Sequence, residues 1–176
     1  IEGGINRVGE GMYDKMNGFG AHEIIIETTN HKKDFSHLDD KKAEDVIWVY
    51  RDRILDLKKD VRFEYVLIFK NRGLTAGASL SHPHSQLIAL PMVPIRVKQE
   101  IQGAKMYFDY KERCIFCDMI KQELKDGSRI VDDNDDFVVL SPFAARFPFE
   151  LCILPKEHSC DFYKLDSDKV RKLAGV

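Results

Sequence analysis

The sequence predicts an α+β fold, and three observations lead to that prediction. Two short runs, residues 22–29 and 65–70, are rich in the β-branched and aromatic residues that favour strands. Between them, residues 38–57 place apolar side chains at helical spacing. From residue 137 onward the order strand, turn, strand, histidine, helix occurs again, which indicates a repeat of elements rather than of residues.

The first elements follow from turn residues and periodicity. Residues 1–17 are rich in glycine and polar side chains, so we expect a loop or a frayed strand there. The strand over 22–29 ends at a Thr-Asn-His turn, and Ser36 is a candidate N-cap for the helix over 38–57. We assign no chemistry to the apolar face of this helix, which is formed by Ala43, Val46, Ile47, Tyr50, Ile54 and Leu57.

Proline and glycine residues divide the middle of the chain. The strand over 65–70 is followed by a glycine-containing loop and then by strand-type residues that end at Pro91. Pro94 can occupy the first position of a helix over 95–110.

A second set of elements begins at a cysteine pair. Cys114 is expected to lead into a short helix, and residues 137–140 and 149–154 are expected to form two strands around a turn. Asp166 or Ser167 can cap the last helix.

Composition excludes several classes of protein. The 27 basic and 29 acidic residues are interspersed and leave a net charge of −2, so no basic field for nucleic acid is expected. Neither an apolar run long enough for a bilayer nor a signal-peptide pattern is present, and we therefore expect no membrane association and a cytoplasmic location. With Cys152 and Cys160 apart from the C-x-x-C pair, a metal site and buried thiols are favoured over a disulfide framework.

The residues most suited to chemistry lie in the sequence S-L-S-H-P-H-S-Q, at 79–86. In an extended chain His82, His84 and Gln86 project from one face, and Pro83 restricts the backbone between the two histidines. Imidazole serves as a metal ligand, a base or a nucleophile near neutral pH. A lone histidine near a strand is more often a surface or hydrogen-bonded residue. Two of them on one face, together with an amide, favour a functional site.

The longer segment N-R-G-L-T-A-G-A-S-L-S-H-P-H-S-Q, at 71–86, resembles the active-site segment of the galactose-1-phosphate uridylyltransferase family. This family is the transferase branch of the histidine-triad superfamily. Four other motifs match it in order: N-G-F-G-A-H-E at 17–23, T-N-H at 29–31, C-I-F-C at 114–117 and P-K-E-H at 155–158.

The resemblance covers nearly the whole chain and implies a histidine-triad-like antiparallel sheet with flanking helices, in two pseudo-repeated halves. Residues 1–112 would be the first histidine-triad-like unit, with its N-terminal part missing, and would carry the active-site motif. Residues 113–176 would be the start of the second unit, with its C-terminal part missing. By the same resemblance we expect a homodimer.

The resemblance also implies a role for each residue of the motif. His84 would attack phosphorus with one ring nitrogen while the other nitrogen donates its proton to the backbone carbonyl of His82. The groups expected to contact the phosphates are Asn71, Gly77, Ala78, Ser79, Leu80 and Gln86. For Asn71 and Ser79, ordinary turn chemistry is the alternative explanation.

Two zinc sites are implied as well. Cys114, Cys117 and His158 would be three ligands of one structural zinc, with a fourth ligand downstream of this chain. His31 and His82 would be two ligands of another, with cysteine partners before Ile1. The alternatives are a thiol pair at a helix start and histidines that are solvated turn residues.

These expectations favour a nucleotidyltransferase that acts on a nucleotide sugar and a sugar 1-phosphate or phosphate, by a ping-pong route. The first hypothesis is a galactose-1-phosphate uridylyltransferase. Ser85 stands where hexose uridylyltransferases commonly have glycine. Ser81 and the Ala-Leu-Pro tail at 89–91 are also closer to the branch that includes plant ADP-glucose phosphorylase. Adenylyl transfer to phosphate, a histidine-triad nucleotide hydrolase and a non-catalytic nucleotide-binding module are the alternatives.

Overall fold

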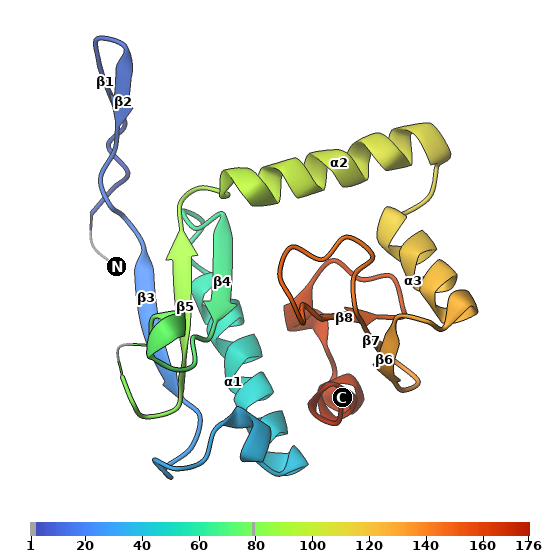
Figure 1. Cartoon of the computed structure of the whole chain (residues 1–176). Coiled ribbons are helices and arrows are strands. Elements are labelled where there is room, and N and C mark those ends of the chain that lie inside the picture. Colours follow the sequence, from blue (N-terminus) through green and yellow to red (C-terminus); the bar gives the residue numbers. More distant parts are fainter. Residues whose placement is uncertain (1–2, 79) are drawn as a thin grey trace. The chain divides into compact units, whose positions relative to one another are not determined.

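The computed structural model describes residues 3–78 and 80–176, and within them it confirms the α+β class (Figure 1). These residues form four α-helices and three small antiparallel sheets. They divide into two compact units. The first unit contains residues 3–39 and Val49–Pro94, and the second contains Asp40–Trp48 and Ile95–Val176. That the chain holds two repeated units which meet after residue 112 stays a prediction.

The N-terminal segment is more ordered than its composition suggested. Strands β1 (Val8–Glu10) and β2 (Tyr13–Lys15) pair as an antiparallel hairpin, with Glu10 opposite Tyr13. Gly11 begins the two-residue turn at a φ of 63°, a left-handed conformation that glycine adopts at little cost. All residues of both strands are exposed, so no alternation of apolar side chains was present to predict them.

The first unit is built on a three-stranded antiparallel sheet in the order β3-β5-β4. Strand β3 (Ala21–Ile26) and strand β4 (Tyr65–Phe69) flank β5 (His84–Leu90), which is therefore the central strand. One face of the sheet packs on the later half of helix α1 (Asp40–Leu57) (Figure 1). The core at this face is made by Ile25, Leu57, Leu87 and Ala89, with Tyr50 packed against it.

The prediction that Ser36 caps the long helix was wrong. A 3₁₀ turn at Phe35–His37 contains Ser36, and Asp34 is its N-cap. The Asp34 carboxylate accepts from the Phe35 N–H at 2.7 Å, and the His37 ring accepts from the Asp34 backbone N–H at 3.4 Å. This reciprocal capping, which replaces the predicted one, begins the 3₁₀ turn, and the turn ends at its C-cap Leu38 before α1 begins at Asp40.

The second unit contains helices α2 (Ile95–Lys111), α3 (Ile115–Asp126) and α4 (Ser167–Ala174). Its sheet has the order β6-β7-β8, formed by β6 (Ile130–Asp133), β7 (Phe137–Leu140) and β8 (Cys152–Pro155). Every residue of β7 is buried, as expected for a central strand. The predicted cap of the last helix is confirmed, because the Asp166 carboxylate accepts from the Lys169 N–H at 2.9 Å.

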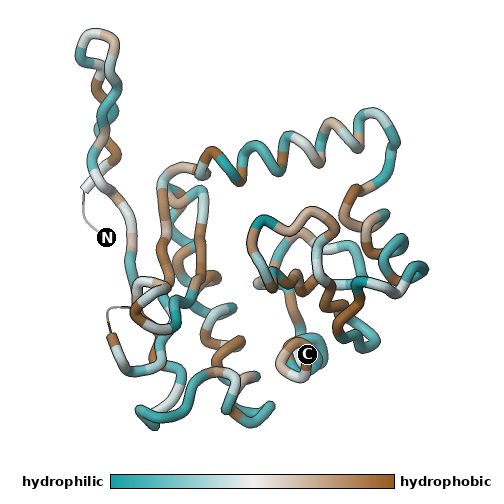
Figure 2. The backbone as a smooth tube through the Cα atoms, in the orientation of Figure 1, coloured by the Kyte–Doolittle hydropathy of each residue, from teal (hydrophilic) through white to brown (hydrophobic). Residues whose placement is uncertain are grey.

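Figure 2 shows how hydrophilic and hydrophobic residues are distributed along the chain. The strands of both larger sheets carry hydrophobic residues, whereas α2 mixes hydrophilic and hydrophobic residues and contains no buried one. Among the described residues, no helix is both long enough and apolar enough to cross a membrane.

Candidate active site

His84 opens the central strand of the first unit, where alternation determines which side chains share a face. Ser85, Leu87 and Ala89 are buried and point toward α1, whereas His84, Gln86 and Ile88 lie on the opposite face. The expectation that His84 and Gln86 share a face is confirmed by this register. His82 lies before the strand begins and is half-buried.

The His84 ring is held in one orientation by the backbone. Its Nδ1 atom lies 2.8 Å from the carbonyl oxygen of His82, and the side chain is buried. Because a carbonyl oxygen can only accept, Nδ1 carries the proton and donates it. In the neutral imidazole, the free lone pair is then on the other ring nitrogen, Nε2. The contact that the family resemblance implied is thus present in the structure.

His84 and His82 line a cavity of about 210 Å³ in the first unit. The facing wall is the loop that carries Asn71, Ala78 and Leu80, three of the residues predicted to contact phosphate. Its rim is cationic, with Lys32, Lys70 and Arg72 against one acid, Asp34. This surplus of positive charge suits a phosphate-bearing ligand.

The other predicted phosphate contacts are placed differently. Gly77 caps a 3₁₀ turn (Leu74–Ala76) at a φ of 85°, so the loop needs a residue without a side chain at this position. Ser79 lies outside the described residues. The Gln86 amide oxygen accepts from Nε2 of His22 at 3.0 Å, which leaves the Gln86 NH2 group available to another acceptor. His22 lies in the motif N-G-F-G-A-H-E at 17–23, but its pairing with Gln86 was not predicted.

A buried hydrogen-bonded chain lies behind the histidine strand. The Ser85 hydroxyl donates to Oε1 of Glu27 at 2.5 Å and lies 2.5 Å from the Tyr50 hydroxyl. The Lys70 ammonium donates to the other carboxylate oxygen of Glu27, also at 2.5 Å. Burial raises the pKa of Tyr50, aided by the nearby Glu27 charge, so its phenol stays a donor. Tyr50 was expected to be core only, whereas its hydroxyl also bonds the site strand.

Asp34 joins this chain to the rim of the cavity. Its carboxylate pairs with Lys70 at 3.1 Å and with Arg72. Partial burial opposes ionisation, but the Phe35 N–H and the two cations together hold the pKa of Asp34 below its usual value. Asp34 is therefore ionised at neutral pH and cancels part of the rim's positive charge.

The cysteine pair and one histidine form a candidate metal centre in the second unit. Ligand atoms of Cys114, Cys117 and His158 all lie within 4.8 Å of one another, and Cys117 Sγ is 3.3 Å from His158 Nδ1. Cys114 is the N-cap of α3, and the backbone N–H of Cys117 lowers the pKa of its thiol. Two thiols and an imidazole at these distances fit one soft divalent cation.

The second predicted pair, His31 and His82, also comes together. Their Nδ1 atoms are 2.8 Å apart, with the rings edge to face. His82 donates its Nε2–H to the carbonyl of Thr28 at 2.6 Å, which directs its Nδ1 lone pair toward His31. Across residues 3–78 and 80–176, only the Cys114 cluster combines three candidate ligands. The described chain thus supplies two ligands here.

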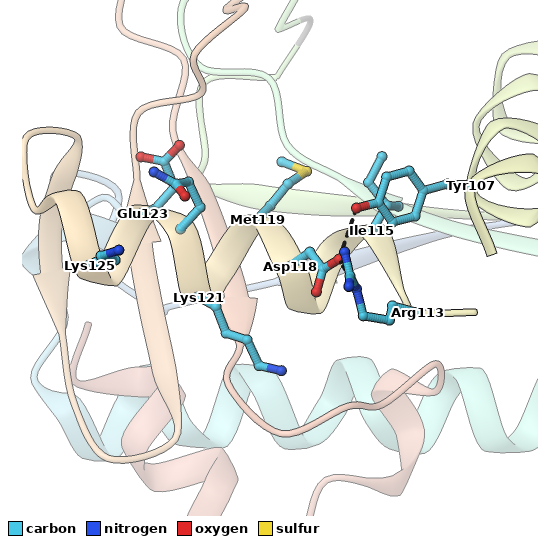
Figure 3. Close-up of a pocket in the computed structure, with 9 residues that line it drawn as sticks. Tyr107, Arg113, Ile115, Asp118, Met119, Lys121, Glu123 and Lys125 are labelled. Atoms are coloured by element: carbon cyan, nitrogen blue, oxygen red, sulfur yellow. Dashed lines mark hydrogen bonds and ion pairs between the residues drawn. The ribbon is translucent and has the colours of Figure 1, made fainter. Parts of the chain in front are cut away.

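A hollow of the second unit carries none of the predicted site residues. It measures about 550 Å³ and lies along α3, lined by Tyr107 of α2, Arg113, Asp118 and Lys121 (Figure 3). Tyr107 and Arg113 both donate to the Asp118 carboxylate at 2.8 Å, so these polar groups satisfy one another. This hollow is open to solvent and lacks the ordered imidazole of the smaller cavity.

Comparison with known sequences places both units in one family. The model described as "Galactose-1-phosphate uridyl transferase, N-terminal domain" matches residues 6–94, and the corresponding C-terminal domain model matches residues 100–176. The chain belongs to the galactose-1-phosphate uridyl transferase family.

Curated members of the uridyl transferase family include an ADP-glucose phosphorylase of Arabidopsis thaliana, which is 39% identical over 90% of this chain and 44% of its own length. A galactose-1-phosphate uridylyltransferase of Thermotoga maritima is 31% identical over 98% of this chain and 54% of its own length. The chain therefore spans about half the length of these relatives.

Solved structures agree with the family assignment and with the fold. The Arabidopsis thaliana ADP-glucose phosphorylase with bound ADP-glucose is 38% identical, with a TM-score of 0.85 over 92% of this chain and half of that one. A uridylyltransferase structure is 30% identical, with a TM-score of 0.90 over 97% of this chain and 54% of that one. The mixed helix and antiparallel-sheet architecture of the uridyl transferase family is thus present here.

Sequence reasoning missed Glu27 and Lys70. One signal could have found Glu27: it continues the inward-facing positions of the strand after Ile25, and a carboxylate there needs a buried partner. Lys70 gave no comparable signal, because lysine at a strand end is normally solvated.

Proposed function

We propose that the protein is a nucleotidyltransferase that acts on nucleotide sugars through a nucleotidyl-His84 intermediate. The observation that carries this proposal is the Nδ1–H bond from His84 to the His82 carbonyl, because in the neutral imidazole it places the lone pair on Nε2, and His84 lines a cationic cavity. Nε2 would attack the α-phosphorus, forming a P–N bond while the bond to the bridging oxygen breaks. A sugar 1-phosphate leaves, and a phosphate oxygen of the acceptor then displaces His84.

The phosphoryl oxygens need preorganised donors during both displacements. Asn71 and the backbone around Ala78 and Leu80 line the cavity and would supply them, together with Gly77, Ser79 and the Gln86 amide. The orientation of Gln86 by His22 supports this role, because its NH2 group is the end left free.

Two acceptors fit the same chemistry. Uridylyl transfer to galactose 1-phosphate or another hexose 1-phosphate is the first reaction to test. Adenylyl transfer to inorganic phosphate is the second, and two observations favour it. The identity to the ADP-glucose phosphorylase, 39%, exceeds the 31% to the Thermotoga maritima uridylyltransferase, and the residue after His84 is a serine.

We further propose zinc as the metal. Cys114, Cys117 and His158 would hold one structural ion, and His31 and His82 would contribute to a second. The second ion would hold the His82 ring and so steady its carbonyl. We also propose two repeated histidine-triad-like halves, a homodimer and a cytoplasmic location.

The test is a labelling experiment on the full gene product. UDP-glucose and ADP-glucose, each radiolabelled at the α-phosphate, are incubated with the protein, and the acid-labile adduct is located by mass spectrometry. We expect label on His84 and none on a His84→Gly variant. Offering galactose 1-phosphate or phosphate to the labelled enzyme then identifies the acceptor.

Other outcomes of this experiment decide between the alternatives. Release of nucleoside monophosphate without an acceptor would indicate a hydrolase. Nucleotide binding with no adduct under any condition would mean a binding module and would overturn the proposal.

A further inference from the structure

Glu27 contacts both residues that flank His84. Its backbone N–H donates to the Pro83 carbonyl at 3.4 Å, and its carboxylate accepts from the Ser85 hydroxyl at 2.5 Å. The next residue, Thr28, accepts from the His82 ring at 2.6 Å. The two residues that follow β3 therefore bond to the chain on both sides of the His84 ring: to His82 and Pro83 before it, and to Ser85 after it.

The Glu27 side chain is fully buried, so its bonds are protected from competition with water. A buried carboxylate requires a charged partner, and Lys70 provides one at 2.5 Å. Lys70 directly precedes Asn71, which lines the cavity, so the Glu27–Lys70 ion pair also holds the start of the loop that carries Asn71. The Glu27 carboxylate thus bonds to protein groups on both of its oxygens.

Ser85 transmits this constraint to the histidine strand. Its hydroxyl donates to Glu27 and therefore accepts from the Tyr50 phenol, whose oxygen is 2.5 Å away. Successive strand residues point to opposite faces, so Ser85 lies behind the strand on which His84 faces forward. Tyr50, Ser85 and Glu27 therefore lie behind the strand, away from a ligand on the His84 face, and Lys70 connects them to the cavity that it also lines.

We infer that Glu27 is a positioning residue: through Ser85 and the Pro83 carbonyl it holds the strand so that His84 presents Nε2 to the substrate. This inference rests on the proposed function. Without the bond from Ser85, the backbone between His82 and Ser85 gains freedom, and the His82 carbonyl no longer stays beside Nδ1. A smaller fraction of the molecules then holds the ring in the reactive orientation. The rate of attack should therefore fall more than the affinity for the substrate does.

The experiment compares Glu27→Gln, Ser85→Ala and Tyr50→Phe with a matched control, Glu23→Gln. Glu23 lies on β3, four residues before Glu27, and its carboxylate is bound by Arg53 at 2.6 and 2.7 Å. The control therefore removes a nearby, partly exposed ion pair whose partner lies outside the histidine segment. Each variant of the full gene product is measured for adduct formation, KM, thermal unfolding and the tautomer of His84 by ¹⁵N NMR.

We expect Glu27→Gln to slow adduct formation about 10- to 100-fold at saturating nucleotide sugar, with KM changed by less than about threefold. Ser85→Ala should have a smaller effect of the same kind, and Tyr50→Phe the smallest. The Nδ1–H tautomer of His84 should become mixed in Glu27→Gln and stay uniform in Glu23→Gln. The control should keep the parent rate within about twofold.

Several results would overturn the inference. A Glu27→Gln protein with the parent rate and the parent tautomer is one, and a loss of rate matched by Glu23→Gln is another. If Glu27→Gln does not fold, unchanged behaviour of both Ser85→Ala and Tyr50→Phe decides against it. Failure of the parent to form any adduct refutes the proposed function instead, and the tautomer comparison still tests the positioning role.

Discussion

The histidine site of the first unit and the cysteine-histidine cluster of the second unit are ordered in different ways. His84 is buried, its ring is fixed by a backbone carbonyl, and a buried hydrogen-bonded chain supports the strand from behind. In the cysteine cluster, His158 is exposed, and its ring lies 3.3 Å from the Cys117 sulfur. The first site is preorganised by protein groups, whereas the second would gain its rigidity from the proposed cation.

Because of this difference, we expect substitutions in the two sites to have different effects. Removing a group from the preorganised site leaves the fold and changes the chemistry. If the proposed cation is structural, removing a group from the cluster should lower the stability of the second unit.

The largest effect is expected for His84→Gly. Loss of a covalent nucleophile should lower turnover by about three orders of magnitude or more, while the midpoint of thermal unfolding stays close to that of the parent. His158→Gly is the matched change in the cysteine cluster. It should lower the midpoint of thermal unfolding and leave the turnover of the folded protein close to that of the parent. Steady-state kinetics and calorimetry on both variants would contradict the comparison if His158→Gly abolished turnover in a fully folded protein.

Metal removal should give the next largest effect, on stability. Because a structural cation contributes directly to folding, a chelator should lower the thermal midpoint by several degrees or more. Cys117→Ser should start from the lower midpoint and no longer respond to the chelator. Elemental analysis before and after treatment is the control, and an unchanged midpoint after proven loss of metal would refute a structural role.

A moderate effect is expected from pH at the rim of the histidine cavity. The pKa of Asp34 is lowered in the folded protein, so ionised Asp34 stabilises it above the ordinary carboxyl pKa. This stabilisation is lost as pH falls from there through the lowered value. Asp34→Asn should remove up to about 1 kcal/mol of that acid-sensitive stability. The unfolding free energies of the parent and of Asp34→Asn, measured from pH 6 to pH 3, should converge at the acid end. Parallel curves for the two proteins would show that Asp34 contributes no acid-sensitive stability.

The smallest effect is expected for a cysteine outside the cluster. Cys160 is exposed and does not belong to the group of candidate ligands, so Cys160→Ser should keep the metal content of the parent. Its unfolding free energy should stay within about 0.5 kcal/mol of the parent value. A loss of metal in this variant would mean that the cluster has been assigned the wrong cysteines.

Elements with a strong local signal were predicted well. The strand at Phe137–Leu140 has the predicted bounds, because four consecutive apolar residues can be satisfied only at the centre of a sheet. The start of α1 was misplaced because Asp34 caps an intervening turn, and the exposed β1–β2 hairpin carries no apolar pattern to read. Local rules fail where the deciding contact is an alternative cap or a pairing without a buried face.

The sequence by itself determined the α+β class, the family and the alternation that places His84 and Gln86 on one face of a strand. These follow from residue types at short spacings, where chain geometry leaves few choices. Only the tertiary structure decided that Glu27, Tyr50 and Lys70 meet behind Ser85. Glu27 directly follows β3, Tyr50 lies in α1 and Lys70 directly follows β4, and the packing of the core brings them together. The partners of a buried carboxylate are distant from it in the sequence, so a local sequence pattern does not predict them.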